Sequence, residues 1–362
     1  MTKARDLSQV PNASLAFKNR IINGDMRIDQ RNNGASVANP NGGLYTLDRW
    51  SIYGTQTSRF NCQQNAGSVT PPTGFINYLG VTSSSAYSVT STDIFSVRHI
   101  VEGLNCADLA WGTSSASAVT LSFWVRSSIT GTFGGAFTNS SQNRSYPFTY
   151  TISAANTWEQ KSIVIPGDTT GTWLTTNGKG IDIFFSLGTG STYSGTAGSW
   201  SGNTFYSATG ATSVVGTNGA TFYITGVQLE KGSTATSFDY RPYGTELALC
   251  RRYYARFGQN TNGTAGDSAA LTMAQWSGNS AYAAQWYQVS MRAAPSFSYS
   301  ANSDFTLLSN GATRTPSSIV QQGASSDRCE IRVDVSVSVT GGDSSWLRIS
   351  GTNGFMAWDS EL

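Results

Sequence analysis

Apolar and polar residues alternate along much of the chain, and this period of two predicts β-strands. Residues 119–126 read VTLSFWVR, so that four apolar side chains face one way while Trp124 and Arg126 face the other. Residues 94–102 carry apolar side chains on both faces, which suits a strand inside a sandwich. Less regular alternation predicts strands at residues 158–165 and 181–187. Residues 331–339 alternate without a break, and we expect their inward side chains to be Ile331, Val333, Val335, Val337 and Val339.

Turn-forming residues separate these short strands. Glycine, serine, threonine and asparagine are abundant, and residues 188–219 form a long Gly/Ser/Thr-rich stretch with scattered aromatic side chains. Many short strands with turns between them are typical of β-sandwiches and jelly rolls. The pattern therefore predicts an all-β protein.

The stretch from residue 221 to residue 254 divides the chain. It begins as a strand in which Gly226 interrupts the alternation, and this predicts a bulge or a close backbone approach. Arg241-Pro242 disfavours helix, after which Gly244-Thr245 opens a short one. The side chains that we expect on one face of this helix are Leu247, Cys250 and Tyr254. One β domain thus closes here, and a helix leads to a second β unit that begins near residue 257.

Composition narrows the functional classes. Aromatic residues make up 12% of the 362 residues, which argues against disorder, and the net charge of +2 gives no support for nucleic-acid binding.

The four cysteines form no C-x-x-C pair, so we interpret them as isolated buried thiols. We expect His99, the single histidine, to be buried rather than catalytic. There is no signal-peptide pattern and no apolar run long enough to cross a membrane, so we expect assembly in a cytosol and no membrane insertion.

Several segments resemble bacteriophage tail-fibre and minor structural proteins. Residues 227–254, which follow the pattern VQLE-G-AT-F--RPYG-ELALC-RYY, are similar to the junction that follows a carbohydrate-binding-module-like jelly roll in those proteins. RIINGDMRIDQRN near the start, V-MR-AP at residues 289–295 and the final DSEL also resemble that family. The resemblance implies that residues 21–28 form the first strand of the jelly roll.

The same resemblance implies a domain order and partners. We expect an N-terminal attachment segment at residues 1–20, a jelly roll at 21–243, and a smaller C-terminal β-sandwich with a short linking helix at 244–362. The family implies a homotrimer that joins other virion tail proteins through the N-terminal segment, is assembled in the host cytoplasm and works in the virion. Its expected role is adsorption to a host cell-surface polysaccharide, with several weak sites acting together.

Two other functions stay open at this point. One is a purely structural fibre, or a decoration protein of the head or baseplate. The other is a polysaccharide-degrading tail enzyme, since two carboxylates at the right separation suffice for a glycosidase. No fixed-period repeat of the β-helix type occurs, and we expect no catalytic residues. The carboxylates from which such a pair would be drawn are Asp93, Glu102, Asp108, Glu159, Asp168 and Asp182.

Aromatic residues beside polar donors are the candidate sugar contacts, because a ring covers the apolar face of a pyranose while polar groups bind its hydroxyls. The candidates are Trp124, Arg126, Trp173, Tyr193, Trp200 and Tyr206. The alternative is that they form small cores under loops or subunit contacts. We expect no cofactor and no metal site. Jelly rolls of this kind often hold a structural calcium ion, for which the candidate ligands are Asp25, Glu230 and Asp239.

Overall fold

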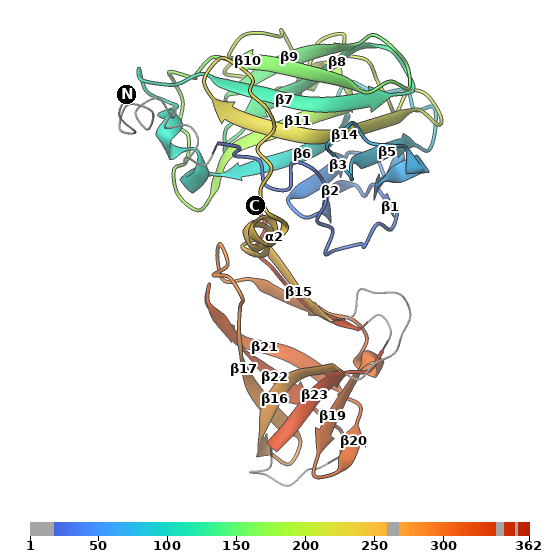
Figure 1. Cartoon of the computed structure of the whole chain (residues 1–362), viewed down its shortest axis with the longest axis vertical. Coiled ribbons are helices and arrows are strands. Elements are labelled where there is room, and N and C mark those ends of the chain that lie inside the picture. Colours follow the sequence, from blue (N-terminus) through green and yellow to red (C-terminus); the bar gives the residue numbers. More distant parts are fainter. Residues whose placement is uncertain (1–17, 259–267, 338–343, 352–353) are drawn as a thin grey trace, which may run out of the picture. The chain divides into compact units, whose positions relative to one another are not determined.

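The computed structural model describes residues 18–258, 268–337, 344–351 and 354–362 (Figure 1). It confirms an all-β protein, with a jelly-roll sandwich followed by a smaller β-sandwich and a short helix, α2 (Tyr243–Arg251), at the start of the latter. The chain forms two compact units: the first ends at Pro242 and also includes Leu362, and the second is Tyr243–Glu361.

The first unit consists of two antiparallel sheets, each with six strands among the described residues. Sheet I has the order β1 (Val37–Ala38), β4 (Phe60–Gln64), β5 (Leu79–Ser83), β14 (Thr221–Lys231), β7 (Val119–Ser127), β10 (Glu159–Ile165). Sheet II has the order β2 (Gly42–Leu47), β3 (Trp50–Gly54), β6 (Ile94–Glu102), β11 (Lys179–Thr189), β8 (Gly131–Thr138), β9 (Ser145–Ile152). A short parallel pair joins β12 (Ser194–Gly195) and β13 (Ser207–Ala208).

The core lies between sheets I and II. The ring of Phe123 on β7 meets that of Phe185 on β11 edge to face, with centroids 5.2 Å apart, and both side chains are fully buried. The predicted alternation of β7 is confirmed: Val119, Leu121 and Val125 are buried as well, whereas Trp124 and Arg126 are only half-buried.

The bulge predicted at Gly226 is present in β14. The pairing register between β14 and β7 shifts between Thr225 and Gln228, and Gly226 has a φ of 60°. A Cβ atom at this position would lie 2.6 Å from the ring of Phe75, so the site also requires glycine for close packing. The predicted bulge and the predicted close approach therefore occur together.

The prediction of a first strand at residues 21–28 is wrong. This segment forms turns in which Asn23 and Met26 have positive φ, and it is held by side chains rather than by a ladder. The amide of Asn23 donates to the carbonyl oxygens of Ile28 and Asp48, at 2.8 and 2.9 Å. Apolar residues of the segment are buried without being in a strand, which alternation alone does not distinguish.

Of the expected attachment segment, residues 1–17 lie outside the described residues. Asn19 and Arg20 are buried against β14: the amide oxygen of Asn19 accepts from the backbone N–H of Leu229 at 3.1 Å, and Arg20 N–H donates to the Leu229 carbonyl at 3.0 Å. The guanidinium of Arg241 donates to the carbonyl oxygens of Asn19 and Ile21. The end of the first unit is thus bonded to its beginning.

The second unit has a seven-stranded sheet III and a three-stranded sheet IV among its described residues. Sheet III has the order β20 (Ala312–Arg314), β19 (Phe305–Ser309), β23 (Ser344–Ile349), β16 (Ser268–Ser277), β17 (Ser280–Trp286), β22 (Arg328–Asp334), β21 (Ser318–Ala324). Sheet IV has the order β15 (Tyr254–Gly258), β24 (Phe355–Asp359), β18 (Ser296–Tyr299). Their shared core includes Trp358 of β24 and Leu347 of β23.

Two predictions for the second unit need correction. The strand predicted at residues 331–339 ends at Asp334, because its partner β17 begins at Ser280, and Val337 is 62% exposed instead of inward. Val339 lies outside the described residues. Helix α2 ends at Arg251, so Tyr254 belongs to β15 rather than to the helix face, and the buried helical side chains are Glu246 and Cys250.

Among the described residues, the remaining helical segments are single 3-10 turns at Ala66–Ser68, Gly103–Asn105, Ala107–Leu109, Ser191–Tyr193 and Asn302–Asp304. Within the described ranges, the helices fall short of the length and apolar character that crossing a membrane requires. The four cysteines are buried thiols that form no disulfide, as expected.

His99 is buried, as predicted, with its ring centroid 4.8 Å from that of Trp50. Burial and then the charge of Arg49 lower the pKa of the imidazole well below 6.5. The unfolded chain therefore binds a proton below about pH 6.5 that the folded chain does not, which costs about 1.4 kcal/mol of stability per pH unit. Above pH 6.5 this loss disappears.

We accordingly expect the free energy of unfolding of the first unit to fall as the pH is lowered from about 7.5 to about 5. Urea unfolding across this range measures the slope. His99→Phe removes the titrating group and keeps a ring beside Trp50, so its slope should be flatter whatever its absolute stability. Equal slopes in the two proteins would contradict the assignment to His99.

Candidate functional site

The six candidate sugar contacts fall in three separate places. Trp124 and Arg126 lie on β7, on the face of sheet I that points away from the core. Trp173 and Trp200 pack together at the edge of the sandwich core. Tyr193 and Tyr206 lie over the outer face of sheet II.

The outer face of sheet I is partly covered around Trp124 and Arg126. Arg126 Nε donates to the carbonyl oxygen of Asn156 at 3.0 Å, and its guanidinium lies 5.5 Å from the ring centroid of Tyr223. Phe75, from the loop before β5, contacts the same surface and packs on Phe238 with centroids 5.1 Å apart. These contacts leave Trp124 half-buried beside a loop.

Trp173 and Trp200 belong to a cluster with Trp111. The three ring centroids are 4.7 to 5.5 Å apart, in edge-to-face pairs. Trp173 Nε1 donates to a carboxylate oxygen of Asp168 at 3.2 Å, and Arg144 holds both oxygens of that carboxylate. The rings pack against each other and their N–H groups are used internally, as expected of a small core under loops.

Tyr206 lines a pocket on the outer face of sheet II, which we call the Tyr206 pocket. It has a volume of about 100 Å³. Its lining residues are Tyr53, Ile94, Arg98, Gln142, Phe184 and Tyr206. The Tyr206 ring lies 4.7 Å from Phe184 and 5.5 Å from Tyr193, and its hydroxyl donates to the amide oxygen of Gln142 at 2.9 Å. Two of the six candidates, Tyr193 and Tyr206, therefore meet here.

Strand pairing and one glycine position the pocket. Arg98 on β6 and Phe184 on β11 are direct cross-strand partners, so their side chains share the outer face. The segment that carries Tyr206 lies directly on β8, because Gly134 has no side chain: a Cβ atom there would lie 2.5 Å from Ser207 Oγ. Gln142 sits in the turn between β8 and β9, where its carbonyl oxygen accepts from Thr204 Oγ1 at 2.6 Å.

The pocket contains a buried ion pair. Arg98 Nε donates to Asp182 Oδ1 at 2.6 Å, and a second guanidinium nitrogen donates to Oδ2. The side chain of Asp182 is 1% exposed and that of Arg98 is 16% exposed. Burial by itself would lower the pKa of Arg98, but the carboxylate of Asp182 raises it, so the guanidinium stays charged. Asp182 is thus a buried, hydrogen-bonded carboxylate.

Burial, and then the charge of Asp182, raise the pKa of the Tyr206 hydroxyl to about 12. The phenol therefore keeps its proton at neutral pH. Because Arg98 and Asp182 cancel each other, the pocket combines aromatic faces with hydrogen-bonding groups and carries no net charge from this pair. Such a surface suits a polyhydroxylated ring, which has apolar C–H faces and hydroxyls that both donate and accept.

Sequence reasoning missed five lining residues: Tyr53, Ile94, Arg98, Gln142 and Phe184. A signal was available for Arg98 and Asp182. Each occupies a polar position within an otherwise apolar predicted strand, and opposite charges at such positions suggest a cross-strand pair.

The three candidate calcium ligands are engaged in other contacts. Asp25 pairs with Arg27 Nε at 2.7 Å, Glu230 accepts from Thr236 Oγ1 at 2.7 Å, and a carboxylate oxygen of Asp239 accepts from the backbone N–H of Asn19 at 3.4 Å. In the part of the chain that the structure describes, no group of three or more His, Cys, Asp or Glu side chains is placed to hold a metal ion.

Comparisons with known proteins give weak structural similarities. A CBM4 structure shares 13% identity with this chain, with 58% of this chain and 99% of the other covered and a TM-score of 0.31. A family 11 carbohydrate-binding module from Clostridium thermocellum, in complex with a mixed-linked tetrasaccharide, shares 11% identity, with 55% and 97% covered and a TM-score of 0.27.

The enzymatically active domain of tailspike protein 4 from bacteriophage CBA120 shares 11% identity, with a TM-score of 0.30. That match covers 51% of this chain and only 19% of the tailspike chain. No protein-family model and no curated protein matches the sequence. Similarities this low assign no ligand to this chain.

Proposed function

We propose that this chain is a virion protein of the tail-fibre or receptor-binding type that adsorbs to a host cell-surface polysaccharide through the Tyr206 pocket. The observation that carries the proposal is the pocket itself. Aromatic rings of Tyr206 and Tyr53 stand beside preorganised polar groups of Gln142 and the Arg98–Asp182 pair. This is the combination of apolar face and fixed hydrogen-bonding groups that sugar recognition needs.

The size and charge of the pocket indicate the kind of sugar. A volume of about 100 Å³ accommodates part of a chain rather than a whole oligosaccharide. Because Asp182 neutralises Arg98, the pocket gives little attraction to an anionic sugar. We therefore infer a neutral sugar unit within a longer surface polysaccharide. One such site is weak, and adsorption by a virion results from many copies that bind together.

The virion assignment rests on the sequence resemblance at residues 227–254. The same resemblance implies that the protein is a homotrimer and attaches to other tail proteins through residues 1–20. It also implies assembly in the host cytoplasm and a final position in the tail or a surface fibre. The bonds from Arg241 to Asn19 and Ile21 support a role for the junction in joining the ends of the first unit.

The proposal includes no enzymatic activity and no cofactor. A glycosidase needs one carboxyl group with a raised pKa that acts as an acid. Among the carboxylates considered from the sequence, Asp168 has a lowered pKa: burial raises it, but hydrogen bonds from Arg144 and other groups outweigh burial. The pKa values of Asp93, Asp108 and Glu159 are also lowered. These carboxylates are bonded to neighbouring side chains, which supports structural roles.

Single substitutions in the full-length chain test the site. Tyr206→Phe removes only the hydroxyl that bonds Gln142, and Tyr53→Ala removes a half-buried ring from the pocket wall. We expect Tyr206→Phe to weaken binding to immobilised bacterial surface polysaccharides about tenfold, the effect of one lost hydrogen bond of about 1.4 kcal/mol. We expect Tyr53→Ala to weaken it at least as much.

Trp124→Ala is the matched control, because it removes a half-buried aromatic side chain from the opposite sheet. Loss of binding in Trp124→Ala with normal binding in both pocket variants would move the site to sheet I. If the wild-type chain binds no polysaccharide and assembles only with virion proteins, the structural-fibre alternative replaces the proposal.

A further inference from the structure

Three exposed tryptophans share one face of sheet III in the second unit. Trp276 on β16, Trp286 on β17 and Trp346 on β23 are 81%, 59% and 48% exposed. Along each strand, exposed positions alternate with buried core positions such as Met273 and Leu347. The three indoles occupy exposed positions and therefore point away from the core of the unit. Several large aromatic side chains exposed on one face of a sheet indicate a candidate binding surface.

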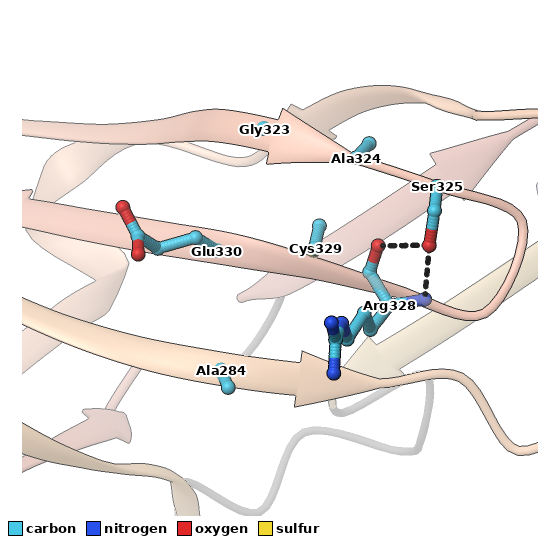
Figure 2. Close-up of a pocket in the computed structure, with 7 residues that line it drawn as sticks. All are labelled: Ala284, Gly323, Ala324, Ser325, Arg328, Cys329 and Glu330. Atoms are coloured by element: carbon cyan, nitrogen blue, oxygen red, sulfur yellow. Dashed lines mark hydrogen bonds between the residues drawn. The ribbon is translucent and has the colours of Figure 1, made fainter.

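A hollow of about 420 Å³ opens on the same face, beside Trp286. Figure 2 shows Arg328 at one end of it and Glu330 at the other, both on β22, with Ala284 on the neighbouring strand β17. Small side chains form its floor: besides Ala284, the lining includes Gly323 and Ala324 at the end of β21. The hollow therefore has an apolar floor and charged ends.

Trp286 and Arg328 are cross-strand partners, and the guanidinium lies 4.9 Å from the indole centroid. Trp346 has a similar neighbour in Arg348, at 5.8 Å. Each arrangement fixes a set of N–H donors beside an aromatic face. At the other end of the hollow, the side chain of Glu330 is exposed and offers carboxylate oxygens that accept hydrogen bonds.

From these observations we infer a second glycan-binding surface on sheet III, with the hollow of Figure 2 and the flanking Trp286 as its centre. Sugar hydroxyls both donate and accept, so one chain satisfies Arg328 and Glu330 together while its C–H faces stack on the indoles. Trp346 and Trp286 are separated by strand β16, which places them about 10 Å apart across the sheet, a span that suits a chain rather than a single ring.

The surroundings favour a glycan over a second copy of this chain. Binding hot spots between proteins cluster in one well-packed apolar patch. Here polar or small exposed residues, such as Thr272, Ser344 and Ala274, stand between the indoles. Each ring is thus a separate stacking plate. This surface does not depend on the Tyr206 pocket, and together the two sites would raise the avidity of each copy for one polysaccharide.

The test uses the full-length chain with Tyr53→Ala, in which the Tyr206 pocket is weakened. The probe is a panel of immobilised bacterial capsular and O-antigen polysaccharides. We expect residual binding in this background, and we expect Trp286→Ala and Trp346→Ala each to weaken it about tenfold, the scale of one lost aromatic contact. Tyr243→Ala, which removes an exposed ring of the same unit from helix α2, should leave it unchanged.

Several results would overturn the inference. One is the absence of residual binding in the Tyr53→Ala chain, and another is residual binding that neither tryptophan substitution changes. A third is a lower oligomeric state of Trp286→Ala in light scattering with unchanged glycan binding, which would make the face a contact between copies. In an otherwise wild-type chain, the Tyr53→Ala effect separately reports on the Tyr206 pocket, so failure of one site is distinguishable from failure of the other.

Discussion

Replacing Asp182 with alanine is expected to lower the free energy of unfolding of the first unit by about 3–5 kcal/mol. The substitution leaves the guanidinium of Arg98 in a largely buried position without its partner carboxylate. The cost comes mainly from that uncompensated charge and much less from the lost attraction. Urea unfolding of the full-length chain, followed through the transition of the first unit, measures it.

The double variant Arg98→Met/Asp182→Leu is the matched control, because it removes both charges and keeps apolar volume. It should recover most of the lost stability, since a buried ion pair contributes little over well-packed apolar side chains. It should still bind polysaccharide more weakly than the wild-type chain, because the Arg98–Asp182 pair of the Tyr206 pocket is gone. A loss below about 1 kcal/mol in Asp182→Ala would mean that solvent reaches the Arg98 charge freely.

Replacing Trp173 with alanine is the second change with a large expected effect, a loss of about 3–5 kcal/mol in unfolding free energy. The indole is buried against Trp111 and Trp200, and its N–H group donates to Asp168. The cavity and the lost hydrogen bond act in the same direction. Thermal or urea unfolding of the first unit measures the loss.

Trp276→Ala is the control for this prediction, because its indole is 81% exposed and its removal should change stability by less than about 0.5 kcal/mol. The outcome also decides between two interpretations of Trp173. If Trp173→Ala keeps wild-type stability but loses polysaccharide binding, the residue is a sugar contact and the tryptophan cluster is the site. Destabilisation with binding retained at low temperature identifies it as core.

The sequence predicts two strands of the sandwich well. Residues 94–102 carry apolar side chains on both faces, and β6 matches them with nearly every position buried. Residues 119–126 alternate strictly, and β7 matches them closely. Alternation is reliable there because every second side chain must reach the core. Residues 21–28 have the same apolar content but are held by the Asn23 side chain, which bonds to groups such as the Asp48 carbonyl, 25 residues away. Long-range side-chain bonds leave no periodic signal.

The candidate site was less predictable for a related reason. Tyr193 and Tyr206 were found because aromatic residues in loops are frequent binding residues. Arg98 and Asp182 are 84 residues apart and become partners only because β6 pairs with β11. Composition alone does not distinguish a loop tryptophan that contacts sugar from one that packs in a core. Only the packed structure separates Trp173 and Trp200, which contact each other, from Tyr206, which lines a pocket, and Tyr193, which packs on Tyr206.

The most direct test mixes the purified full-length chain with intact bacterial surface polysaccharides and follows both the bound fraction and the polymer length. An adsorption protein predicts saturable binding to at least one polysaccharide, with the polymer length unchanged after long incubation and the binding weakened by Tyr53→Ala. Shortened polymer would contradict the account by revealing an enzyme, and an absence of binding across the panel would contradict it in favour of a purely structural fibre.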